Sequence, residues 1–199
     1  MTRRASRSTM RLRKNGTLRI LDFDIETRRV GFFTAGKFGP DGCEPIAIAA
    51  SWVGERAVHV WLQPEHTIPE MLAGFVELYT AADMVTGHYV RKFDLPILNG
   101  SLFEHGLPLL EDKLVSDTKT DLVTKAGISA SQENLGAMLA LADSKYHMND
   151  HRWRQAARLS PAGVEEARKR VVADVRQHKK LRVALIAAGA LKPPTEWRP

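Results

Sequence analysis

The distribution of hydrophobic residues divides the chain into a β-rich first part and a largely helical second part. Residues 18–26 (LRILDFDIE), 46–53 (IAIAASWV) and 57–62 (AVHVWL) are rich in aliphatic and aromatic side chains and have the length of strands. A turn-like Gly-Glu-Arg joins the second segment to the third. Three such segments in succession predict an antiparallel meander.

From residue 68 the hydrophobic positions recur at helical spacing. They are Ile68, Met71, Leu72, Phe75, Val76 and Tyr79. A short strand is predicted at 84–86, a helix at 93–105 that ends at a glycine, and another short strand at 113–118. The pattern therefore changes from strands alone to alternating helices and strands.

The remainder of the chain is predicted to be helical, with helices at 131–141, 150–158 and 160–188. Ser160-Pro161 is a typical start for the last of these, and Gly189 is a typical end. The order βββ-αβα-β-ααα predicts one α/β domain, with a mixed central sheet, flanking helices and a helical C-terminal part.

Composition is that of an ordinary soluble globular protein. Hydrophobic residues make up 44% of the 199 residues and charged residues 26%, and no apolar run approaches the roughly 20 residues that cross a bilayer. The charged N-terminus lacks the apolar segment of a secretory signal. One cysteine, Cys43, excludes an internal disulfide, and no Cys/His spacing suggests zinc. We therefore expect a cytoplasmic protein with no membrane contact.

The net charge of +6 is concentrated at the N-terminus. Residues 1–19 contain seven Lys and Arg and no acid, which leaves 22 basic and 23 acidic residues elsewhere. The sequence thus predicts a basic arm at 1–17, a domain at 18–190 and a tail at 191–199. Such an arm either binds phosphate nonspecifically or is simply solvated. A second basic segment, 168–182, carries seven Lys and Arg and one acid, Asp174.

Acidic residues at three places in the chain are candidates for a metal site. Asp22, Asp24 and Glu26 alternate along the first predicted strand, so they share one face and repel one another unless water or cations compensate. This face is either a solvated edge or a divalent-metal site. Asp94, at the start of a predicted helix, is either a helix cap or a ligand. Asp174 is either an ion-pair partner or a ligand.

Three strings in this order, FDIET, FDLPIL and ADV, resemble the DEDD (DnaQ-like) superfamily of 3′–5′ exonucleases. That family carries D-x-E on its first strand, an Asp after an aromatic residue, and an Asp on a late helix. The matching residues here are Asp24, Glu26, Asp94 and Asp174, and the resemblance covers about residues 18–190.

The resemblance implies an RNase H-like fold and two Mg²⁺ or Mn²⁺ ions held by the four acids. It also implies release of nucleoside 5′-monophosphates from the 3′ ends of DNA. A DNA polymerase acting in trans is a candidate partner, since 199 residues hold no polymerase domain of their own. Two alternatives stay open: an exonuclease for RNA or short oligonucleotides, and a catalytically silent nucleic-acid-binding protein.

The chain departs from the family where a general base is expected. Active members place a Tyr four residues, or a His five residues, before the last Asp; here these positions hold Arg170 and Lys169. Arginine cannot accept a proton, and lysine does so only with a strongly lowered pKa. Histidines elsewhere are the candidate bases, namely His147, His151 and His178.

Basic and aromatic residues near these motifs are candidate nucleic-acid contacts. Cations hold phosphates, and an aromatic ring stacks on a base. The candidates are Arg91, Lys92, Trp153, Lys169 and Arg170.

Overall fold

A computed structural model of the protein describes residues 17–30, 42–124, 127–141 and 146–199. The predicted basic arm, except for Thr17, lies outside the described residues. The strands of the described part form one six-stranded sheet in the order β3-β2-β1-β4-β5-β6. They are β1 (Ile20–Arg29), β2 (Cys43–Trp52), β3 (His59–Leu62), β4 (Met84–Gly87), β5 (Lys113–Asp117) and β6 (Thr195–Trp197).

The sheet is mixed, as the sequence predicts. Strands β1, β2 and β3 pair antiparallel and form the expected meander, whereas β4 pairs parallel with both β1 and β5. Along β1 and β2, Asp24 lies opposite Ala49 and Glu26 opposite Ala47. The register then shifts between Glu26 and Thr27, so regular pairing is interrupted directly after the D-x-E motif.

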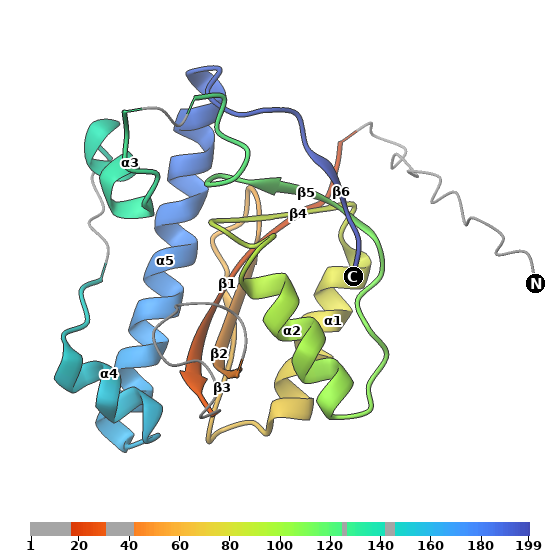
Figure 1. The fold of residues 1–199 in the computed structure, drawn as a ribbon, viewed down its shortest axis with the longest axis vertical. Helices are drawn as coiled ribbons and strands as arrows, with labels where there is room; N and C mark the ends of the chain where they lie inside the picture. Colours follow the sequence, from red (N-terminus) through yellow and green to blue (C-terminus); the bar gives the residue numbers. More distant parts are fainter. Residues whose placement is uncertain (1–16, 31–41, 125–126, 142–145) are drawn as a thin grey trace, which may run out of the picture.

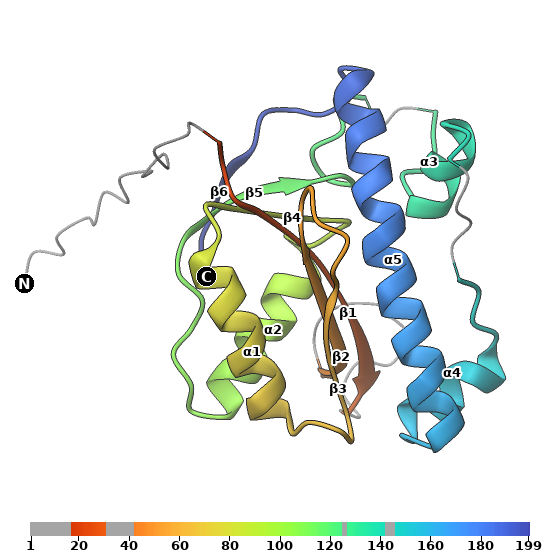
Figure 2. The same cartoon turned by 180° about the vertical axis from the view of Figure 1, so that it is seen from behind.

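Helices cover both faces of the sheet. Figures 1 and 2 show α1 and α2 on one face and the long α5 across the other, with α3 and α4 packed beside α5. No helix of the described residues combines the length and hydrophobicity needed to cross a membrane. The bounds are α1 (Ile68–Ala81), α2 (Asp94–Glu104), α3 (Gln132–Met138), α4 (Asp150–Ala157) and α5 (Pro161–Ala187).

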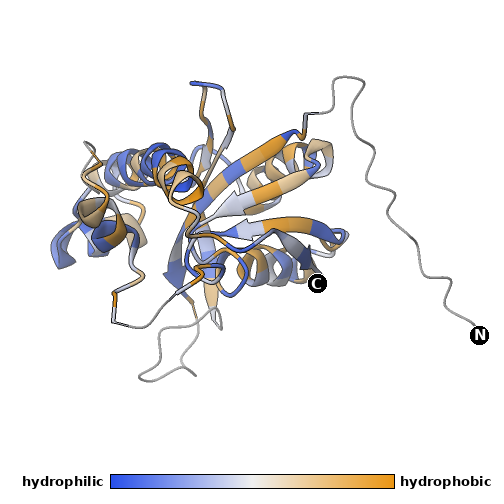
Figure 3. Ribbon diagram, turned by 90° about the horizontal axis from the view of Figure 1, so that it is seen from above, coloured by the Kyte–Doolittle hydropathy of each residue, from blue (hydrophilic) through white to orange (hydrophobic). Residues whose placement is uncertain are grey.

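The two faces of the sheet differ in character. Leu21, Phe23 and Ile25 of β1 point into the main hydrophobic core under α1 and α2. On the opposite face, a smaller cluster packs Val171 and Val175 of α5 against β2 and β3. Figure 3 shows hydrophobic and hydrophilic residues alternating along strands and helices, as this two-sided arrangement requires.

The predicted tail contributes to the sheet. Residues 195–197 form β6, which pairs antiparallel with β5, and Leu191 bridges to Leu122. Trp197 packs against the main core, so its burial stabilises a strand too short to be recognised from its hydrophobic pattern.

A close approach between α4 and α5 depends on Gly163. A Cβ at this position would lie 2.1 Å from the carbonyl carbon of Gln155 and 2.3 Å from the amide nitrogen of Ala156. The neighbouring Ser160 caps α5 by accepting a hydrogen bond from the Gly163 N–H. Because the conflict is with backbone, a side chain at position 163 forces the two helices apart.

We predict that Gly163→Ala lowers the free energy of unfolding by about 1–3 kcal/mol, because overpacking outweighs the higher helix propensity of alanine. Gly100→Ala is the matched control, since a Cβ there meets nothing within 4 Å. That control should gain up to about 1 kcal/mol. Urea denaturation of both variants measures the difference, and changes of the same sign would contradict the role of Gly163.

Candidate metal centre

Three of the predicted ligands meet between β1 and α5. Asp24 and Glu26 lie on the face of β1 that α5 crosses, and Asp174 lies on the side of α5 that faces them. One ligand oxygen from each carboxylate lies within 4.8 Å of the other two. Asp24 is half-buried, whereas Glu26 and Asp174 are buried. Strand alternation and helix placement together therefore bring distant acids into one cluster, here called the acidic triad.

The fourth predicted ligand, Asp94, lies beside this cluster at the first residue of α2. Its Oδ1 accepts a hydrogen bond of 3.2 Å from the N–H of Ile25, the residue between Asp24 and Glu26. Burial raises the pKa of Asp94 to about 8; its own amide lowers the pKa, and the charge of Asp117 raises it. The contact ties α2 to the strand that carries the triad, although Asp94 is not part of the 4.8 Å cluster.

Arg170, four residues before Asp174, reaches the acidic triad. Its Nε lies 2.7 Å from Oδ2 of Asp174 and 3.2 Å from Oε1 of Glu26. The guanidinium also donates to the backbone carbonyl of Tyr146 and lies 5.9 Å from the ring centroid of Trp153. The position where the family places a tyrosine thus holds a cation in contact with two of the carboxylates.

The next turn of α5 carries a second polar contact with β1. The ring of His178 is buried, with Nδ1 at 2.7 Å from Oδ2 of Asp22 and Nε2 at 2.9 Å from Oγ1 of Thr118. Thr118 in turn lies 3.0 Å from Nδ1 of His88. The sequence places Asp22 on the same face as the triad, but its pairing with His178 follows only from the packing of α5.

The other candidate bases are on the surface. His147 is exposed, and its Nε2 lies 3.4 Å from Oε1 of Glu133. His151 is exposed near the start of α4. Of the three histidines, His178 is the one on α5, four residues after Asp174, but its two ring nitrogens are engaged with Asp22 and Thr118.

The candidate nucleic-acid contacts lie in different settings. Arg91 donates to the carbonyls of Val115 and Thr195, so it braces β5 against the last strand. Lys92 is exposed in the turn that precedes α2. Lys169 is exposed and lies 3.7 Å from Glu165, one turn earlier on α5. A role in binding nucleic acid stays a prediction for each of these residues.

Asp117 organises the loop that leads to Asp94. Its buried carboxylate accepts hydrogen bonds from the backbone amides of Tyr89 and Arg91 in that loop. Tyr89 has a φ of 75°, a conformation that such hydrogen bonds help to maintain. The Asp-Thr pair at the end of a predicted strand is the sequence signal for this residue.

The donor set fits a hard divalent cation. Carboxylate oxygens on a rigid strand and helix are the ligands that Mg²⁺ and Mn²⁺ prefer. Three acids this close repel one another, and a cation relieves that repulsion. Asp24, Glu26 and Asp174 therefore form an acidic cluster with the chemistry of a metal site.

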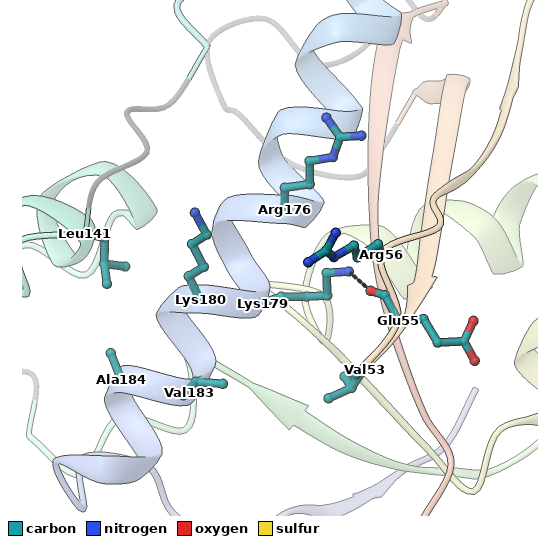
Figure 4. Close-up of a pocket in the computed structure, with 10 residues that line it drawn as sticks. Val53, Glu55, Arg56, Leu141, Arg176, Lys179, Lys180, Val183 and Ala184 are labelled. Atoms are coloured by element: carbon teal, nitrogen blue, oxygen red, sulfur yellow. Dashed lines mark hydrogen bonds between the residues drawn. The ribbon is translucent and has the colours of Figure 1, made fainter.

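A separate concave surface lies on another side of α5. It encloses about 820 Å³ between α5 and the turn that joins β2 to β3. Because an α-helix has about 3.6 residues per turn, Arg176 and Lys180 point away from the side that carries Asp174. In Figure 4, Lys179 donates to the backbone carbonyl of Glu55, and the Glu55 carboxylate points away from the cavity. The lining residues are Val53, Gly54, Glu55, Arg56, Leu141, Arg176, Lys179, Lys180, Val183 and Ala184.

Comparison with known proteins identifies a similar fold among the solved structures. No protein-family model matches the sequence, and no curated protein matches it. Among solved structures, the family B DNA polymerase from the hyperthermophilic archaeon Pyrobaculum calidifontis superposes with a TM-score of 0.64 and 18% identity. The match covers 85% of this chain and 25% of the polymerase, so this chain spans about a quarter of that protein.

The similarity confirms the predicted fold class. A mixed six-stranded sheet, helices on both faces and a long C-terminal helix define an RNase H-like α/β fold. At 18% identity the match establishes the fold alone. The function must be argued from the site.

We predict that His178→Ala lowers the free energy of unfolding by roughly 2–3 kcal/mol, because the buried Asp22 carboxylate loses a hydrogen-bond partner. His147→Ala and His151→Ala, at exposed positions, should each change it by less than about 0.5 kcal/mol. Chemical denaturation of the three variants measures the effect. Equal values for His178→Ala and His147→Ala would contradict a structural role for His178.

Asp94 should make the metal-free protein less stable as pH rises. Its folded pKa of about 8 lies above the unfolded value of about 3.9, so the folded state holds the proton between these values. The contribution of Asp94 to the free energy of unfolding is greatest below pH ~4, and it is lost as pH rises through ~8. In EDTA, Asp94→Asn should lose less Tm between pH 5 and pH 8.5 than wild type.

The exposed Glu77→Gln serves as the control for this pH series. It should follow the wild-type Tm at every pH. A wild-type Tm that rises between pH 5 and pH 8.5, together with an unchanged slope in Asp94→Asn, would refute the assignment.

Proposed function

We propose that this chain is a divalent-metal-dependent 3′–5′ exonuclease that acts on DNA. The observation that carries the proposal is the convergence of Asp24, Glu26 and Asp174 within 4.8 Å. They meet in an RNase H-like fold similar to part of a family B DNA polymerase. The same three acids match the motifs of DEDD exonucleases, in the same order along the chain.

In this proposal Asp24, Glu26 and Asp174 hold Mg²⁺ or Mn²⁺. The ion supplies positive charge at the scissile phosphate and lowers the pKa of a water molecule. The chain's part is to fix the carboxylates: β1 holds two of them, and α5 holds the third. Asp94 joins this arrangement through its hydrogen bond to the Ile25 amide, which sets α2 against β1.

DNA is the proposed substrate, and a separate polymerase is a proposed partner. The protein whose structure superposes on this fold is a DNA polymerase, which supports DNA as the substrate and a DNA polymerase as the partner. The basic cavity with Arg176 and Lys180 supports a polyanionic substrate, because phosphates are attracted to such cations regardless of base sequence.

The test uses oligonucleotides labelled at the 3′ or the 5′ end, offered as single-stranded DNA, duplex DNA or RNA, with Mg²⁺, Mn²⁺ or EDTA. We predict stepwise shortening of DNA from its 3′ end, with release of nucleoside 5′-monophosphates, only when metal is present. Asp24→Asn and Asp174→Asn should each reduce the rate at least about 100-fold, which corresponds to about 2.7 kcal/mol of transition-state stabilisation. Glu77→Gln, on the far face of the sheet, is the matched control.

Three results would contradict the proposal. Shortening that persists unchanged in EDTA or in Asp24→Asn would show that the activity depends neither on metal nor on the acidic triad. Faster shortening of RNA than of DNA would assign the same chemistry to RNA. Binding of oligonucleotides with no shortening under any metal condition would identify a catalytically silent nucleic-acid-binding protein.

A further inference from the structure

The side chain of Arg170 is largely buried and contacts two carboxylates of the acidic triad. Its side chain is 12% exposed, and its Nε contacts Asp174 at 2.7 Å and Glu26 at 3.2 Å. One cation therefore bridges a carboxylate of β1 and a carboxylate of α5.

Two further elements hold the guanidinium in place. The backbone carbonyl of Tyr146 accepts a hydrogen bond from it, and the ring of Trp153 on α4 lies 5.9 Å from it. The other cations of the same helix segment differ: Arg168 pairs with Glu65 and Glu165 at the surface, and Lys169 pairs with Glu165. Of these three cations, Arg170 is the one whose ion pairs join Glu26 and Asp174.

The position of this cation limits what the carboxylates can hold. Arginine stays protonated at every relevant pH, so its charge is permanent. Arg170 already places one positive charge against two of the three carboxylates. A second divalent ion would meet a like charge that already shares Glu26 and Asp174. The carboxylate of Asp94 does not add negative charge to this cluster, because Asp94 lies outside the 4.8 Å group.

We propose that Arg170 is a resident cation that takes the place of one metal ion, so that each chain binds a single divalent ion. This inference rests on the proposed metal-dependent function. It differs from the two-ion site that the resemblance to DEDD exonucleases implies. It also accounts for an arginine where a tyrosine is expected, since the residue there supplies charge and not a proton acceptor.

Isothermal titration calorimetry of the metal-free protein with Mn²⁺ tests the inference, and the free ion is counted independently by electron paramagnetic resonance. We expect one Mn²⁺ per chain in wild type and two in Arg170→Met. Arg168→Met is the matched control, because it removes the same charge two residues away from a surface ion pair. It should retain one ion per chain.

A second variant guards against a loss of folding. Arg170→Lys keeps the positive charge on an unbranched side chain, and it should bind one ion. Circular dichroism and Tm confirm that each variant is folded before it is titrated. A folded Arg170→Met protein that still binds one ion would overturn the inference, as would a wild-type protein that binds two.

Failure of this inference is distinguishable from failure of the proposed function. If wild type shortens DNA in a metal-dependent way and binds two ions, the role of Arg170 is refuted and the proposed exonuclease function is retained. No bound ion in either wild type or Arg170→Met would refute both. No ion in wild type but one or two in Arg170→Met would show that Arg170 excludes metal, which contradicts a single-ion site.

Discussion

The contact between the acidic face of β1 and the long helix α5 is the interaction on which the rest of this structure depends. Burying several carboxylates costs free energy unless cations or hydrogen-bond donors meet them. Helix α5 supplies these partners about two turns apart: Arg170 to Glu26, and His178 to Asp22. The polar contacts set the rotation of the helix on the sheet, while its valines pack against the alanines of β2. Stability and site geometry therefore have the same origin.

Much of the fold follows from periodicity. The strands of the meander, the helices and the final long helix lie within a few residues of their predicted positions. These elements carry continuous hydrophobic patterns and recognisable caps, which are local signals. Strand β6 lacks such a signal, because three residues with one partly buried aromatic side chain, Trp197, owe their conformation to pairing with β5. Pairing of this kind depends on contacts far apart in the sequence.

The acidic cluster follows from the sequence less completely. Alternation along β1 places Asp24 and Glu26 on one face, and the motif order adds Asp174. The setting of Arg170 and the pairing of Asp22 with His178 depend on how α5 lies across the strand. Helical spacing identifies which residues of α5 share a face, but it does not identify the residue of β1 that each of them contacts. The partners became identifiable only once the tertiary packing was known.

The irregular pairing after Glu26 has a consequence for how this strand tolerates change. Up to that residue β1 is in register with β2, and beyond it the register shifts. Loss of one residue between Ile20 and Asp24 would turn the acids toward α1 and α2 and the apolar residues toward α5. Insertions beyond Thr27 leave that alternation intact. We therefore expect insertions and deletions to be tolerated after Thr27 and not between Ile20 and Asp24.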